Sequence, residues 1–201
     1  IEKEVRNGIF SVYLLGGAST PLSDYIVDYL PVSIGLKSNT VSGRLMLDYQ
    51  LGNFTITASE TYTVRSNTRL ERNSYFTTKS ILSNEVEMPN VNMLSLRTGY
   101  RSNWLIAEAI ITDMKTLGGF DITRNNMPFP SNRMNATTIA ANFKYEIQKV
   151  PGLSVVGGVS RVIKGRNMGQ STGFYSGLFY ILNFQKKEKN NQMTNTSTEK
   201  N

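Results

Sequence analysis

The chain alternates between apolar and polar residues over unusually long stretches. Between residues 53 and 67, Phe54, Ile56 and Ala58 share one parity, and Thr and Ser fill most of the other. The same period recurs in seven further segments, at 9–19, 41–50, 93–101, 104–115, 137–148, 153–163 and 174–184. A period of two is that of a β-strand, and a helical period is nowhere sustained. The pattern therefore predicts an all-β chain of about eight strands.

The connections between these segments differ in length in a regular way. Short turns with turn-forming residues lie at 51–53, 101–103 and 149–152. The other connections are long and cover 20–40, 67–91, 117–136 and 164–173. In an antiparallel up-and-down order, this alternation places every short turn at one end of the sheet and every long loop at the other.

Short turns at one end and long loops at the other are typical of a transmembrane β-barrel. The apolar parity would face lipid, and the hydroxyl-rich parity a wet interior. Glu60 falls on the lipid parity, so it lies near an interface or follows a register change. A soluble barrel is the alternative, but its outer face would be rich in Lys and Glu. We therefore predict an outer-membrane β-barrel over 1–184, with periplasmic termini, and a polar tail over 185–201.

Aromatic residues fall toward the ends of the predicted strands. Interfacial girdles of a membrane barrel are built from such residues. The residues concerned are Tyr49, Phe54, Tyr100, Trp104, Tyr145, Phe174 and Phe184.

The amino-acid composition limits the partners and the reactions that the chain can have. The chain has 22 Lys and Arg against 15 Asp and Glu, a formal net charge of +7, which suits an anionic partner. No basic run carries interleaved aromatics, so we predict no nucleic-acid binding. The chain contains neither Cys nor His, which excludes disulfides, thiolate chemistry and the Ser-His-Asp arrangement. We therefore predict that the protein is not an enzyme and has no cofactor.

Charged residues on the predicted interior parity are the candidate pore lining. Five are basic and three acidic, which hints at anion preference. If about eight strands close by themselves, however, the same residues would form an ion-pair network that fills a narrow barrel. The candidates are Arg44, Asp48, Arg65, Arg97, Arg101, Glu108, Lys144 and Glu146.

Two of the long loops, 23–36 and 118–134, hold the candidate ligand residues. Loops this long are usually functional or disordered, so they form either an inward constriction or a packed extracellular cap, and the cap is favoured. Three Asp residues offer oxygen ligands for Ca²⁺, but no spacing demands a metal. The basic run 164–167 lies near the outer rim, where lipopolysaccharide phosphates would be found. The loop candidates are Asp24, Tyr25, Asp28, Asp121, Arg124, Phe129 and Arg133.

Three stretches also carry a resemblance to a known family. They are "STPLSDYIVDYLPVSIGLKSNTVSGRLMLDY" at 19–49, "FDITRNNMPFPSNRMNATTIAANFKYEI" at 120–147 and "GRNMGQSTGFYSGLFYILNF" at 165–184. Together they resemble bacterial outer-membrane transporters related to proteins associated with phenol meta-pathway degradation genes. Members of that family are longer, which implies further N-terminal strands and a complete barrel of about twelve. In this interpretation the chain is the C-terminal part of the larger barrel.

Two functions remain open from the sequence. The first is a porin or passive transporter for a small solute, hydrophobic or anionic. The second is a non-conducting barrel that serves a cell-envelope complex and binds other envelope proteins through its loops or tail. A third, an outer-membrane lipid enzyme, is disfavoured because the chain has no His. Lipid and lipopolysaccharide are the expected surroundings of the barrel in every case.

Overall fold

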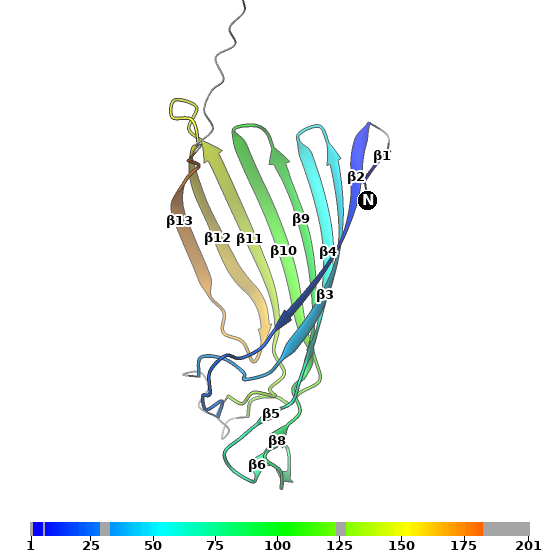
Figure 1. The fold of residues 1–201 in the computed structure, drawn as a ribbon, viewed down its shortest axis with the longest axis vertical. Coiled ribbons are helices and arrows are strands. Elements are labelled where there is room, and N and C mark those ends of the chain that lie inside the picture. The colour runs from blue at the N-terminus through cyan, green and yellow to red at the C-terminus, as the bar shows by residue number, and fades with distance from the viewer. Residues whose placement is uncertain (1, 6, 29–32, 124–127, 183–201) are drawn as a thin grey trace, which may run out of the picture.

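The computed structural model describes residues 2–5, 7–28, 33–123 and 128–182, and its main feature is one nine-stranded antiparallel sheet (Figure 1). The described residues contain no helix that could cross a membrane. The strands of the sheet are β1 (Glu2–Val5), β2 (Gly8–Ser19), β3 (Thr40–Leu51), β4 (Phe54–Arg65), β9 (Asn90–Arg101), β10 (Leu105–Leu117), β11 (Asn135–Glu146), β12 (Leu153–Arg166) and β13 (Thr172–Tyr180).

Each strand pairs with the next long strand along the chain, so the sheet is an up-and-down meander. All eight segments predicted from the alternation contain strands. Short turns alternate with long loops as predicted up to β11. The predicted long loop over 164–173 is wrong, because β12 continues to Arg166 and only the residues 167–171 connect it to β13. The tight turn after β3 is closed by Gly52 at φ 56°, a left-handed conformation that glycine adopts without strain. The short strand β1 was not predicted. Within the described residues the two edge strands, β1 and β13, do not pair with each other.

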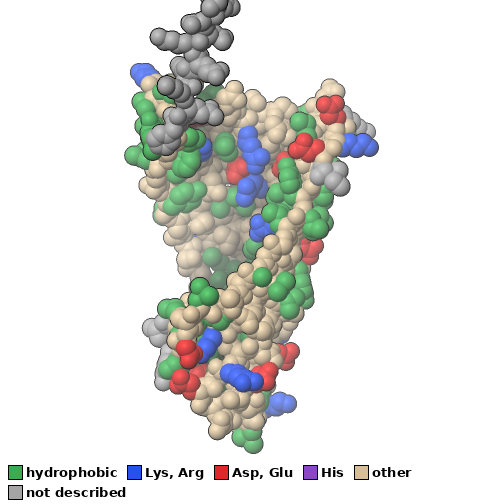
Figure 2. Space-filling model, in the orientation of Figure 1, with side chains coloured by type: hydrophobic (Ala, Val, Ile, Leu, Met, Phe, Trp, Pro, Cys, Tyr) green, Lys and Arg blue, Asp and Glu red, His purple; other side chains and the backbone are tan. Residues whose placement is uncertain are grey.

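The sheet is strongly curved, and its two faces differ in an unusual way. On β4, Phe54 and Ile56 point outward and are 67% and 47% exposed, whereas Thr55 and Thr57 are only 3% and 7% exposed. The other long strands also carry exposed apolar residues on the outward parity, among them Leu94, Leu96, Ile139 and Phe143. Figure 2 looks into the hollow of the sheet and shows Lys, Arg, Asp and Glu side chains gathered there, toward the end with the short turns. The convex face is therefore apolar and the concave face polar.

Glu60 lies on the convex face, as its parity requires. The pairing of β3 with β4 runs without interruption from Thr40 opposite Arg65 to Leu51 opposite Phe54. The predicted alternative of a register change at Glu60 is therefore wrong. Instead, Asn92 of β9 donates from Nδ2 to Glu60 Oε1 at 2.9 Å, so the carboxylate has a polar neighbour on the same face.

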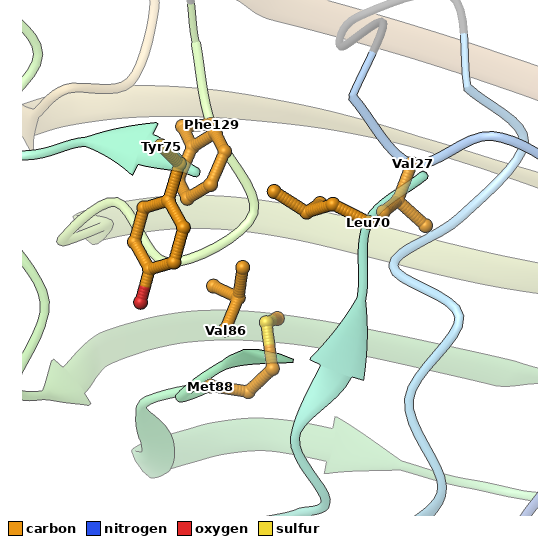
Figure 3. Close-up of a cluster of buried hydrophobic side chains, with 6 residues drawn as sticks. All are labelled: Val27, Leu70, Tyr75, Val86, Met88 and Phe129. Atoms are coloured by element: carbon orange, nitrogen blue, oxygen red, sulfur yellow. The ribbon is translucent and has the colours of Figure 1, made fainter. Parts of the chain in front are cut away.

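The buried hydrophobic cluster lies among the loops, not inside the sheet (Figure 3). The loop after β4 folds back on itself through two small hairpins, β5 (Thr68–Arg69) with β8 (Glu85–Val86) and β6 (Tyr75–Phe76) with β7 (Ser80–Ile81). Side chains from three long loops meet there, and we call the described parts of the four connections at this end of the sheet the loop cap. The buried members of the cluster are Val27, Leu70, Tyr75, Val86, Met88 and Phe129.

Candidate functional site

All eight candidate lining residues lie on the concave parity of the sheet. Their positions follow from the register: Arg44 stands opposite Thr61, Arg97 opposite Thr57, and Glu108 opposite both Gly99 and Asn142. Since side chains on one parity of paired strands share one face, the sheet gathers these charges in its hollow. The complete set is Arg44, Asp48, Arg65, Arg97, Arg101, Glu108, Lys144 and Glu146.

Two arginines of β9 bind the same carboxylate of β10. Arg101 Nη2 lies 2.9 Å and its Nε 3.3 Å from Glu108 Oε1, and Arg97 Nη1 lies 3.5 Å from Oε2. The Glu108 side chain is only 11% exposed, whereas those of Arg97 and Arg101 are 43% and 34% exposed. This cluster carries a net charge of +1, and its two cations remain open to the hollow.

The remaining charges of the concave face bind hydroxyls or aromatic rings. Arg44 donates from Nε to Thr61 Oγ1 at 2.7 Å, and Asp48 accepts a hydrogen bond from Thr57. Lys144 Nζ lies 4.9 Å from the centre of the Phe179 ring, a cation–π contact between β11 and β13. These contacts hold the cations against the wall without neutralising them.

Arg65 and Glu146 mark the two ends of the concave face. Arg65 closes β4 on the loop side, where its backbone N–H donates to Asn90 Oδ1 at 3.0 Å. Glu146 closes β11 on the turn side, where its backbone N–H donates to the carbonyl of Trp104 at 2.8 Å. The candidate charges therefore span the whole length of the strands.

The three candidate loop carboxylates each pair with a different basic side chain. Asp24 binds Lys37, Asp28 lies 3.2 Å from Arg72, and Asp121 is held by Arg166 at 2.6 and 2.8 Å. Among the described residues no group of three acidic side chains is placed to hold a metal ion. The three carboxylates therefore act as ties between loop segments.

Two of these carboxylates have lowered pKa values. The Arg166 guanidinium and the Asn167 amide, both hydrogen-bonded to Asp121, lower its pKa to about 2. The ammonium of Lys37 likewise lowers the pKa of Asp24. Both groups are therefore ionised throughout the physiological range, and the ties they form do not switch near neutral pH.

The other loop candidates belong to the packing of the loop cap. Phe129 is buried and stacks on Tyr75 with ring centres 5.3 Å apart, and Tyr25 accepts a hydrogen bond from the backbone N–H of Lys37 at 2.8 Å. Arg133 donates to the carbonyls of Gly118 and Gly119. Arg124 lies outside the described residues, as do Phe184 and the tail over 185–201. The described loops favour a packed cap over a loop folded into the hollow.

The basic partners of the loop carboxylates were not singled out from the sequence. Lys37 and Arg72 lie 13 and 44 residues from the carboxylates they bind, in segments with no periodicity that would orient them. In the sequence, Arg166 stands out only as part of the basic run 164–167. Ion pairs between loops leave no local pattern, so no sequence signal identifies them.

Aromatic residues gather on the convex face beside the short turns. Phe54 meets Tyr100 edge-on at 5.6 Å, and Trp104 meets Tyr145 edge-on at 5.8 Å. Such edge-to-face pairs add stability beyond the area they bury. The predicted clustering of aromatics toward strand ends is therefore present at this end of the sheet.

Comparison with family models, curated proteins and solved structures finds no match for this chain. The resemblance to phenol meta-pathway-associated outer-membrane transporters consequently stays a prediction. The fold and the placement of the charged residues rest on the chain's own geometry.

Proposed function

We propose that this chain forms the wall of a bacterial outer-membrane β-barrel that acts as a porin or passive transporter for a small solute. One observation carries the proposal: the exposed face of the sheet is apolar and the sheltered face is hydroxyl-rich and charged. A water-soluble sheet has the opposite arrangement, because apolar burial drives its folding. In lipid the apolar face is already in its preferred solvent, and only the interior requires polar groups.

The apolar part of the convex face has the extent of a membrane band. On β9 the outward positions run from Tyr100 through Thr98, Leu96 and Leu94 to Asn92, and Thr98 is the one polar side chain between the two ends. Eight residues of strand measure about 27 Å, or about 20 Å in height at a tilt of about 40°. Outer-membrane barrels carry a band of about 25 Å flanked by aromatics, which the girdle at Phe54, Tyr100, Trp104 and Tyr145 matches at one end.

Toward the long loops, each strand from β4 to β12 carries a polar residue on the convex face. These polar outward residues are Glu60, Asn92, Asp113, Thr137 and Arg161, one from each successive strand. Asp113 is paired directly with Thr137, Asn92 is diagonal to both Glu60 and Asp113, and Arg161 is diagonal to Thr137, so the five residues form a staggered row. Such a row is what a membrane–water interface requires, and it supplies a reason for the otherwise misplaced Glu60.

A barrel in lipid must also be closed. Unpaired backbone N–H and C=O groups in hydrocarbon cost several kcal/mol each, so the free edges of β1 and β13 require strand partners. The resemblance described above implies additional strands in a barrel of about twelve, which would leave a wider interior than eight strands do.

The concave face suits a small anionic or polar solute. Arg44, Arg97 and Lys144 hold their cations by hydroxyl, ion-pair and aromatic contacts that leave positive charge facing the hollow. Rings of basic side chains favour anions in pores. The proposed transporter therefore prefers anions over cations.

A specific observation also supports the non-conducting alternative. The buried cluster ties three long loops together and the Asp121–Arg166 pair ties the loop after β10 to the end of β12, and Figure 1 shows the loops lying together at one end of the sheet. A permanently packed cap would obstruct diffusion. It would then present a rigid surface to another envelope protein, as the second function requires.

Measuring ion conductance distinguishes the porin from the non-conducting barrel. The refolded protein in a planar bilayer under a salt gradient should give stable steps with a reversal potential on the anion side. Glu108→Gln removes the carboxylate that Arg97 and Arg101 share, so the reversal potential should move further toward the anion limit. Asp24→Asn, which removes a carboxylate from an exposed loop position, is the matched control and should leave selectivity unchanged. A protein that inserts but never conducts would refute the porin and favour the structural role.

A further inference from the structure

A β-bulge near the end of β12 reorients two basic side chains. Pairing with β11 sets Ile139 opposite Arg161 and Thr138 opposite Val162, and then skips to Thr137 opposite Lys164. Ile163 is the extra residue. Without it, Lys164 would share the parity of Val162 and face the hollow. With it, Lys164 and also Arg166, which stands opposite Asn135, point out from the convex face.

The reoriented side chains form one side of a small groove. The groove has a volume of about 290 Å³, and Lys115 of β10 contributes a third cation from across β11. Lys115 binds Asp113 at 2.7 Å, and Thr137 donates to the same carboxylate at 2.8 Å. Its lining residues include Asp113, Lys115, Asn135, Thr137, Lys164 and Arg166.

Positive charge is in excess at this groove. Lys115 and Arg166 are each matched by a carboxylate, those of Asp113 and Asp121. In the part of the chain that the structure describes, Lys164 has no ion-pair partner within 4 Å. Arg161, three residues earlier on the same strand, also has none there and adds to the excess. The groove therefore keeps a net positive charge, which suits a mobile anion.

The groove borders the apolar band directly. Thr137 belongs to the polar row described above. Toward the short turns, the next outward residue on β11 is Ile139, and on β12 Arg161 is followed by Val159. Ile163 and Phe174 add exposed apolar surface nearby, Phe174 being 79% exposed. Cations and hydrogen-bond donors thus lie immediately above a surface that suits hydrocarbon chains.

We infer that this groove binds the phosphate of a lipid headgroup in the outer leaflet, of the phosphorylated glycolipid class. The inference rests on the proposed membrane location. Lys and Arg are the usual ligands of phosphate oxygens, and basic residues at headgroup depth attract anionic lipids. The adjoining apolar surface selects a lipid-borne phosphate over a free one, because it contacts the acyl chains as well.

Native mass spectrometry of the full chain in detergent tests the inference. The probes are bis-phosphorylated lipid A, its dephosphorylated form, and inorganic phosphate as a competitor. One Lys near an anionic lipid surface contributes about fivefold in affinity, so K115Q/K164Q should bind the phosphorylated lipid about 25-fold more weakly. K115R/K164R keeps both charges and should bind within about twofold of the wild type. K79Q/K149Q removes two exposed charges elsewhere and should have no effect.

Each variant is also inserted into phosphatidylcholine vesicles and tested for protease protection. This second assay distinguishes a failure of the proposed groove from a failure of the proposed membrane location. Equal binding of both lipid forms, or unchanged binding by K115Q/K164Q, would overturn the groove while leaving the membrane barrel intact. Full competition by inorganic phosphate would also overturn it, since the site would then serve a free anion. A wild-type chain that does not insert would overturn the proposed function and this inference together.

Discussion

The substitution Leu96→Arg tests whether lipid or water covers the convex face of the sheet. Leu96 lies on β9 midway between Tyr100 and Asn92, about 13 Å of strand from each, which places it near the middle of the apolar band. Arginine at the midplane of an outer-membrane barrel costs about 2–4 kcal/mol and much less near the interfaces. The side chain is 46% exposed, so in water the same substitution would change stability by about 0.5 kcal/mol at most.

The assay is reversible urea unfolding of the protein in phospholipid vesicles, with the free energy of unfolding extrapolated to zero denaturant. Leu82→Arg is the matched control. Leu82 is 89% exposed in the loop after β4, away from the band, and its substitution should be neutral. The membrane account predicts a loss of about 2–4 kcal/mol for Leu96→Arg alone. Equal and small effects at both positions would refute the reasoning, because they would show that water covers the convex face.

Three further predictions concern the loop cap and the hollow. Phe129→Ala removes the ring stacked on Tyr75 and should lower the local stability of the cap by about 3 kcal/mol, seen as faster amide exchange in the loop after β4, while exchange in β9 to β11 stays unchanged. The pKa of Asp121 is lowered from its ordinary 3.8 to about 2, so the stability that this carboxylate contributes is present above pH 3.8 and is lost as the pH falls through 2. Asp121→Asn should therefore loosen the loop after β10 at neutral pH. Equal protease sensitivity of the variant and the wild type would contradict this. Lys144→Met removes the cation over Phe179 and should move the reversal potential toward neutral selectivity, whereas Lys79→Met should not.

The sheet could be predicted from the sequence because a period of two is a local signal. On β4, Thr, Ser or Arg fills every position of one parity from Thr55 to Arg65, and the Gly of the preceding turn fixes where the strand begins. Each parity then decides one face, so the concave position of Arg44, Arg97 and Glu108 follows from the pattern alone. The short strand β1 carries charge on both parities and gave no such signal.

The groove and the loop cap could not be predicted from the sequence. Ile163 is an ordinary strand residue in the sequence, and only its pairing with β11 reveals that it is the extra residue of a bulge. The predicted seventh strand ended at 163, so Lys164 and Arg166 were placed in a loop and assigned no face. The cap depends on contacts between loops far apart in the chain, such as Asp28 with Arg72, and such contacts have no period.

Cysteine scanning along β4 tests the central claim most directly, since the chain has no native Cys. Single Cys at each position from 54 to 65, carrying a nitroxide label in vesicles, would be assayed for collision with oxygen, which concentrates in lipid, and with a water-soluble nickel chelate. The account predicts a period of two: high oxygen contact at Phe54, Ile56 and Ala58, and high chelate contact or neither at Thr55, Thr57 and Ser59. Chelate contact at the apolar positions equal to that at an exposed loop position such as Leu82 would contradict it.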